Sequence, residues 1–327
     1  MKKNLIVIAL GILLIGCKSE NQNQEKVKIE NQTIVMPTFD SDSAFSYVKA
    51  QTDFGPRVPN TESHQLCASY LEKKLVEFCD TVFIQPFTAV AYDGKKLASK
   101  NIIGSFSPEK ESRILLAAHW DSRPMADHDP NPDNRNKAID GANDGASGVG
   151  VLLEVARQLQ LKNPEIGVDI VFFDAEDYGT PESVDIPGDW WCLGAQYWAR
   201  NQHVKNYHAD FGIVLDMVGA SDAKFYHEGI SSYYAQDVIA KIWSAAYKLG
   251  HGNYFINQSA NPVTDDHYYV NKIARIKMID IIHQDMTTGT GFCSVWHTTH
   301  DQIDQIDKAP LQAVGTTLLE IIYNEKH

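Results

Sequence analysis

Short apolar segments alternate with segments of helical periodicity through most of this chain, and this alternation constrains the fold more than any other feature. Continuous apolar runs are typical of strands buried on both faces of a largely parallel sheet. Between and after these runs, residues 149–159, 239–249 and 311–323 repeat apolar side chains at helical spacing. The pattern predicts an α/β fold, a three-layer sandwich whose mixed, mostly parallel central sheet has helices on both faces. The four apolar runs are 113–118 (RILLAA), 168–173 (VDIVFF), 211–215 (FGIVL) and 276–279 (IKMI).

The residues that precede the first apolar run predict two helices and a pair of strands. Residues 43–51 and 62–78 have the spacing of amphipathic helices. Residues 81–90 and 101–106 are expected to form strands, with a turn signal at 92–94 (YDG) between them. We therefore expect the helices and this strand pair to open the domain.

The N-terminal residues predict an exported protein. Lys2 and Lys3 precede an apolar run over 5–15, which is shorter than the roughly 20 residues that a membrane-spanning helix needs. It fits the core of a secretory signal. The run ends in Leu-Ile-Gly-Cys at Cys17, which resembles the bacterial lipoprotein signal and implies lipidation of that cysteine. The alternative is an ordinary cleaved signal with an incidental cysteine.

This interpretation divides the chain into three parts. Residues 1–17 are the signal, the polar residues 18–35 are a flexible tether, and residues 36–327 are a single domain. The protein is then expected to be anchored to a bacterial membrane through its lipid only, facing the periplasm. Its net charge of −13 argues against a nucleic-acid partner, because phosphate binding relies on Lys and Arg. An exported location permits disulfides, but the pairing of Cys67, Cys79, Cys192 and Cys293 is left open, and free thiols are equally compatible with the sequence.

Acidic side chains come after each of the four predicted apolar strands. In open α/β sheets, ligands bind beyond the carboxyl ends of the strands. Carboxylates gathered there would repel one another, and a divalent cation would neutralise them. The residues in question are His119 and Asp121 after the first strand, Glu176 and Asp177 after the second, Asp216 at the end of the third and Asp280 after the fourth.

Two further residues extend this set of candidate metal ligands. Asp144 lies in the stretch GANDG (141–145) at the start of a predicted helix, where it could instead cap that helix. His297 follows Trp296 outside any predicted element. Two acids and a histidine with an open fourth position form a normal catalytic zinc set. Mixed oxygen and nitrogen ligands also suit manganese or cobalt, so the residue types alone leave the metal open.

Taken together, six motifs resemble the zinc aminopeptidase superfamily of the M28 type, from about residue 39 to the C-terminus. Within it, the closer resemblance is to glutaminyl-peptide cyclotransferases of the animal-like type, because Trp296 directly precedes His297 and Trp190 and Trp191 lie in an insertion after the Glu-Asp pair. Three positions depart from the cyclotransferase pattern, namely Asp177, Asp280 and Ala118, where glutamate, histidine and cysteine are usual. The motifs are HWDS (119–122), GANDGASG (141–148), FFDAED (172–177), LDM (215–217), DDH (265–267) and WHT (296–298).

The resemblance implies a role for each candidate residue. It implies one zinc ion held by Asp144, Asp177 and His297, with Glu176 as general acid and base. Asp216 and Asp265 are implied as supporting catalytic acids. The walls of a substrate pocket are Trp296, Trp191 and Trp190, with core packing as the alternative. His119 and Asp121 are candidates for a second metal, which stays open, and His267 and Asp280 could either assist the site or lie behind it.

The activity that the resemblance implies is conversion of N-terminal glutamine in peptides or proteins to pyroglutamate, with release of ammonia. A zinc aminopeptidase is the first alternative, since it would share the fold and most of the ligands. A non-catalytic binding module on the same fold is the second. Ammonia release from a peptide that begins with glutamine separates the first two, and bound zinc separates both from the third.

Overall fold

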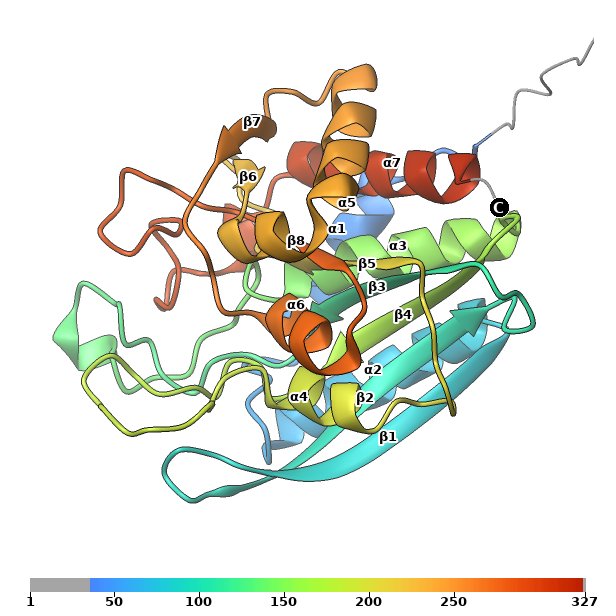
Figure 1. Cartoon of the computed structure of the whole chain (residues 1–327). Helices are drawn as coiled ribbons and strands as arrows, with labels where there is room; N and C mark the ends of the chain where they lie inside the picture. Colours follow the sequence, from blue (N-terminus) through green and yellow to red (C-terminus); the bar gives the residue numbers. More distant parts are fainter. Residues whose placement is uncertain (1–35, 326–327) are drawn as a thin grey trace, which may run out of the picture. The chain divides into compact units, whose positions relative to one another are not determined.

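A six-stranded sheet forms the centre of the molecule, with the strand order β1-β2-β4-β3-β5-β8 (Figure 1). The computed structural model describes residues 36–325. Strands β3, β4, β5 and β8 are parallel to their neighbours in this group, whereas β2 pairs antiparallel with both β1 and β4. The strands are β1 (Thr81–Val90), β2 (Lys96–Phe106), β3 (Arg113–His119), β4 (Gly167–Phe173), β5 (Phe211–Asp216) and β8 (Met278–Ile282), and a separate short pair consists of β6 (Phe225–His227) and β7 (Phe255–Ser259).

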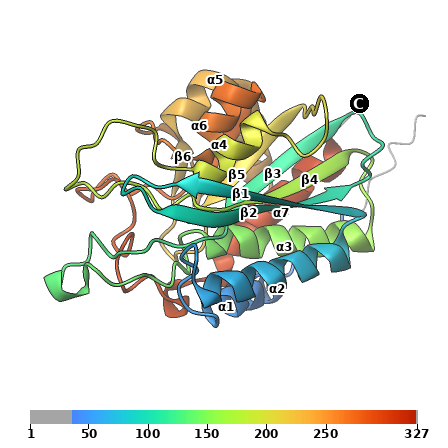
Figure 2. The ribbon, with the colours of Figure 1, turned by 90° about the horizontal axis from the view of Figure 1, so that it is seen from below.

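Helices cover both faces of this sheet (Figure 2). One face carries α1 (Ser41–Thr52), α2 (Glu62–Phe78), α3 (Ala146–Leu161) and α7 (Lys308–Asn324). The other carries α4 (Leu193–Arg200) and α6 (Asp266–Tyr269), while α5 (Gly229–Lys248) packs along β8 and α7. Short 3₁₀ turns cover Pro132–Asn134 and Ile303–Gln305, and a π turn covers Val270–Ala274. The predicted three-layer α/β sandwich is confirmed.

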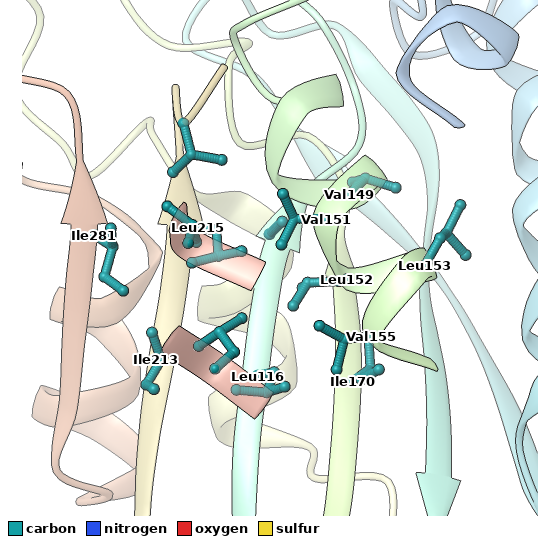
Figure 3. Close-up of a cluster of buried hydrophobic side chains, with 14 of the residues drawn as sticks. Leu116, Val149, Val151, Leu152, Leu153, Val155, Ile170, Ile213, Leu215 and Ile281 are labelled. Atoms are coloured by element: carbon teal, nitrogen blue, oxygen red, sulfur yellow. The ribbon is translucent and has the colours of Figure 1, made fainter. Parts of the chain in front are cut away.

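The apolar character of the central strands follows from burial on both faces. Side chains alternate across a strand, so Leu116 of β3 faces one helical layer and Leu115 faces the other. Figure 3 shows Leu116 beside Ile213 of β5, with Leu152 of α3 over the sheet. Every residue of β3, β4 and β5 is buried, which explains why their sequences lack the alternation of a half-exposed strand.

Most predicted elements overlap those of the structure, although β2 begins at Lys96 and α5 at Gly229, earlier than expected, and the fourth parallel strand lies later than expected. Residues 276–279 were expected to form it, whereas β8 covers Met278–Ile282. At the start of the strand, the Asn271 side chain holds both backbone groups of Met278, at 2.7 and 3.1 Å. The expectation that Asp280 follows the strand is therefore wrong: Asp280 lies within β8, opposite Val214 of β5, and is buried.

The predictions for the N-terminal signal, for Cys17 and for the tether over 18–35 fall outside the described residues. Residues 36–325 belong to one compact unit. Within this range, the helices are too short or too polar to cross a membrane. The four cysteines left open by the sequence, Cys67, Cys79, Cys192 and Cys293, are free thiols.

Candidate metal centre and active site

A pocket of about 450 Å³ opens beyond the carboxyl ends of the parallel strands, within the size range of ligand-binding pockets. His119 is the last residue of β3 and Asp216 the last of β5, so both side chains reach the same edge of the sheet. The pocket is lined on its polar side by Asp144, Glu176, Asp177, Asp216, Asp265, Gln284 and His297. Five of these groups are carboxylates, and none of the described residues that line the pocket is Lys or Arg.

Asp144, Asp177 and His297 converge as the sequence predicted. One potential ligand atom from each lies within 4.8 Å of the other two. The His297 Nε2 is 3.2 Å from Asp177 Oδ1 and 3.8 Å from Asp144 Oδ2. All three side chains are buried, and Asp177 Oδ2 has no hydrogen-bond partner among the described residues. Buried carboxylates without partners are costly, so this donor set fits a divalent cation such as zinc.

His119, Asp144 and Asp216 form a second group of the same kind. The His119 Nε2 lies 3.0 Å from Asp144 Oδ1 and 3.3 Å from Asp216 Oδ1. Asp144 therefore belongs to both groups, and the geometry is compatible with a second ion, as the sequence left open. The alternative role of Asp144 as a helix cap is wrong, since Gly145 occupies the N-cap position of α3 and no side chain caps it.

Two acids hold the loops that carry these groups. Asp121 accepts the backbone N–H of Glu176 at 3.0 Å and of Asp177 at 3.2 Å, and it lies 3.6 Å from the Nδ1 of His119. Asp301, which the sequence did not single out, accepts the backbone N–H of Asp144 at 3.0 Å. The loops are thus fixed through their backbone amides.

Glu176 lies beside the candidate metal ligands without belonging to either triad. Burial, opposed by His119 and reinforced by Asp177 and Asp265, raises its pKa well above the ordinary value. Burial and Asp144 likewise raise the pKa of Asp216 to about 7. A bound dication would oppose these shifts by stabilising the charged forms. Acids with shifted pKa values in a pocket are candidates for proton transfer.

Cys192 contacts Glu176 directly, which the sequence did not predict. Its thiol donates to Glu176 Oε1 at 3.2 Å, and its backbone N–H donates to the Glu176 carbonyl at 2.9 Å. Burial and the neighbouring acids raise the pKa of the thiol well above its usual range. The thiol therefore stays protonated and acts as a hydrogen-bond donor to the carboxylate.

Replacing Cys192 with alanine is expected to lower the turnover number (kcat) of a reaction that uses Glu176 for proton transfer by about 2- to 10-fold, because one hydrogen bond contributes roughly 0.5–1.5 kcal/mol. Cys192→Ser keeps a donor and should stay closer to the wild type. Steady-state kinetics of both variants check this, with Cys79→Ala, remote from the pocket, as the control. Equal kcat for wild type and the alanine variant would show that the thiol does not assist Glu176.

Trp296 and Trp191 line the pocket, whereas Trp190 does not. The Trp296 ring stacks on His297 with centroids 3.6 Å apart. Phe292 packs on the same tryptophan at 4.6 Å. Trp190 instead packs against Gly188. Trp120 is buried and lines no part of the pocket, and its indole N–H donates to the Lys100 carbonyl at 3.2 Å.

A buried cluster consists of Asp265, His267 and Asp280. Of these three residues, only Asp265 lines the pocket. His267 is 3.7 Å from Asp280 and 3.0 Å from Glu228. Glu228 was not found by sequence analysis, and its position at the N-cap of α5 gives no hint of this contact. His267 and Asp280 therefore lie behind the pocket.

The acid stability of the fold should depend on Glu228. Burial alone would raise its pKa, but hydrogen bonds from His267 and from backbone N–H groups outweigh burial and lower the pKa to about 2. A carboxyl whose pKa is lower in the folded state than in the unfolded state stabilises the fold at pH values above its ordinary pKa of 4.5. This stabilisation disappears as the pH falls from 4.5 towards the folded-state pKa of about 2. It amounts to roughly 3 kcal/mol at neutral pH.

We therefore expect Glu228→Gln to lower the free energy of unfolding at pH 7 and to flatten its decline between pH 4.5 and 2. Urea unfolding across this range, in the presence of a chelator, measures the effect. Glu62→Gln, on the exposed first turn of α2, is the control. Parallel pH profiles for wild type and Glu228→Gln would contradict the prediction.

Comparison with known proteins agrees with this geometry. Residues 101–322 match peptidase family M28. The chain belongs to this family. Among family members, a crystal structure of Bacteroides thetaiotaomicron glutaminyl cyclase bound to N-acetylhistamine is 54% identical, with a TM-score of 0.87, and the match covers 89% of this chain and 100% of the other. A Zn-dependent exopeptidase from Parabacteroides distasonis is 53% identical, with a TM-score of 0.88 and the same two shares covered.

A more distant relative points in the same direction. Glutaminyl-peptide cyclotransferase of Drosophila melanogaster is 27% identical over 281 residues, which cover 78% of this chain and 73% of the fly protein. The predicted resemblance to family M28 and to glutaminyl-peptide cyclotransferases is thus confirmed.

Proposed function

We propose that this protein is a zinc-dependent glutaminyl-peptide cyclotransferase, which converts N-terminal glutamine to pyroglutamate and releases ammonia. The observation that carries the proposal is the position of Glu176 beside the Asp144, Asp177 and His297 triad in one acidic pocket. Likeness to a solved glutaminyl cyclase over 89% of the chain supports it. The substrates would be peptides or proteins that begin with glutamine.

In this reaction the α-amine attacks the γ-carbonyl of its own side chain, so a C–N bond closes the ring and the bond to the amide nitrogen breaks. Zinc, when bound, would supply Lewis-acid polarisation of that carbonyl. Glu176 would take a proton from the attacking amine and deliver one to the leaving nitrogen, which departs as ammonia. Asp216 and Asp265 would hold the amine through its N–H groups, and the amine would attack in its neutral form, so that the one proton passed through Glu176 completes the ammonia.

We further propose one zinc per chain, with Trp296 and Trp191 as walls that restrain the glutamine side chain. Both tryptophans line the pocket, and Trp296 stacks on the His297 ring. A ring on either side would limit the rotation of a short side chain and favour the cyclic geometry.

An aminopeptidase is the second candidate, because His119, Asp144 and Asp216 form a further triad suited to a second ion. One experiment separates the two activities. The purified protein is incubated with a Gln-initiated dipeptide, and ammonia and free amino acid are followed together. Ammonia with an intact peptide bond supports cyclisation, whereas free amino acid without ammonia overturns it. Metal analysis of the same sample tests for a binding module, which would lack stoichiometric zinc.

The residues before position 36 support a separate proposal about location. We propose export, lipidation at Cys17 and attachment to a bacterial membrane through the lipid. Membrane fractionation of the wild type and of Cys17→Ser tests this. Equal membrane association of the two would contradict a lipid anchor.

A further inference from the structure

Arg123 is a fully buried cation that contacts two segments of the candidate zinc centre from outside the pocket. Its Nε and Nη2 donate to the two carboxylate oxygens of Asp127, each at 2.7 Å. Its Nη1 donates to the Asp177 carbonyl at 3.0 Å and lies 3.4 Å from Asp177 Oδ1 and 3.5 Å from the Gly179 carbonyl. Each edge of the planar guanidinium thus binds a different segment of the chain.

Asp127 carries this contact onward to the ligand histidine. Its Oδ1 lies 3.3 Å from the His297 Nδ1, an ion-pair contact whose two atoms are not aligned for a hydrogen bond in the described structure. A carboxylate on one ring nitrogen fixes the orientation and tautomer of the imidazole, so that the other nitrogen faces the metal. Arg123 therefore touches Asp177 directly and His297 through one carboxylate, although these two ligands are far apart in the sequence.

The same guanidinium supports a wall of the pocket. Its central carbon lies 4.7 Å from the centre of the Trp191 ring, within the range of a cation–π contact. Trp191 is almost parallel to the His297 ring, with an interplanar angle of 8°. Trp191 also packs on Gly179, so closely that a Cβ added to Gly179 would lie 2.0 Å from the indole.

We propose that Arg123 is a positioning residue that fixes the zinc ligands Asp177 and His297 and the Trp191 wall as one unit. The inference rests on the zinc centre of the proposed function. If so, a single residue outside the pocket lining, Arg123, affects both the affinity for zinc and the affinity for substrate.

The sign of the effect on zinc separates positioning from simple electrostatics. A nearby positive charge repels a dication, so removing it would strengthen zinc binding if charge were its only influence. Loss of a group that orients metal ligands instead weakens metal binding by about 10–100-fold. Arg123→Met removes the charge and the hydrogen bonds and leaves a stem of similar bulk, so the two explanations predict opposite results.

The first experiment measures zinc affinity by competition with a chromophoric chelator, which needs no turnover. We expect Arg123→Met to bind zinc about 10–100-fold more weakly than the wild type. Arg123→Lys keeps the charge but loses the two-pronged guanidinium, so its zinc affinity should lie between those of the wild type and Arg123→Met. Arg157→Met is the matched control, because it breaks another two-bond arginine–carboxylate pair, with Glu154 on α3. It should leave zinc affinity unchanged.

Zinc binding by Arg123→Met that equals or exceeds that of the wild type overturns the proposal. If Arg123→Met does not fold, Arg123→Lys is the test. Zinc affinity of Arg123→Lys equal to that of the wild type would likewise overturn the proposal. The outcome is independent of the cyclotransferase assignment: a wild type that binds zinc but releases no ammonia contradicts the proposed function alone.

A second variant tests the wall. Gly179→Ala should displace Trp191 while leaving the ligand side chains in place. We expect KM for a Gln-initiated peptide to rise by about 2- to 10-fold, the size of a lost aromatic contact, and KM is measured at saturating zinc so that a change in zinc affinity does not enter it. Arg123→Met, assayed with saturating zinc, should show a similar rise in KM. An unchanged KM in both variants refutes the link between Arg123 and the wall.

Discussion

Glu176→Gln is expected to lower kcat for pyroglutamate formation by about 10²–10⁴-fold, the usual contribution of a positioned acid or base, while zinc binding is retained. Glutamine has nearly the same shape as glutamate and can still accept the hydrogen bond from Cys192. It cannot take a proton from the attacking amine. Glu176 belongs neither to the triad of Asp144, Asp177 and His297 nor to that of His119, Asp144 and Asp216; its own cluster is with Cys192 and Asp265. The change should therefore leave a cation held by the first triad in place.

The measurement combines ammonia release with zinc analysis of the same preparation. Glu182→Gln is the matched control: its side chain is 83% exposed on the loop that follows Glu176, and its kcat should equal that of the wild type. Turnover of Glu176→Gln near the wild-type rate would remove Glu176 from the catalytic role. Loss of zinc together with activity would instead assign Glu176 to the metal.

The positions of the metal ligands could be predicted because they follow from chain-local patterns. Parallel strands bring their carboxyl ends to one edge of the sheet, so His119, Glu176, Asp177 and Asp216 were expected to meet. The limits of the strands were predicted from apolar runs. This prediction was wrong at β8, where a buried acid interrupts the apolar run. Asp280 looked like the end of a strand but lies in its middle, because the packing behind the pocket accepts a carboxyl group there.

The residues that position the site could not be predicted, because their partners are distant in sequence. Asp127 meets His297 across 170 positions, and Asp301 meets the Asp144 backbone across 157. Neither acid follows a strand or belongs to a recognised motif. Arg123 follows the HWDS motif directly, but nothing in its neighbours indicates contact with Asp177. Such contacts depend on loop paths, which periodicity does not describe.

His297→Ala is expected to abolish both zinc binding and turnover. The imidazole is the nitrogen ligand of the candidate triad, and its Nε2 faces both Asp144 and Asp177. Without it, two carboxylates remain, and zinc sites in proteins almost always use at least three protein ligands. The loss in affinity should exceed the roughly 10–100-fold that follows removal of a group behind a ligand, so no activity is expected at micromolar zinc.

Thermal unfolding tests this prediction without relying on activity, because zinc that binds only the folded state stabilises it. At 100 times the dissociation constant the wild type should gain about 2.7 kcal/mol from zinc, whereas His297→Ala should gain almost nothing. Each protein is compared with its own zinc-free form, because His297 is buried and stacked on Trp296, so its removal also lowers the stability of the fold without zinc. His300→Ala, an exposed histidine in the same loop, should respond to zinc like the wild type. Equal stabilisation of His297→Ala and wild type by zinc would place the cation elsewhere, with the triad of His119, Asp144 and Asp216 as the next site to test.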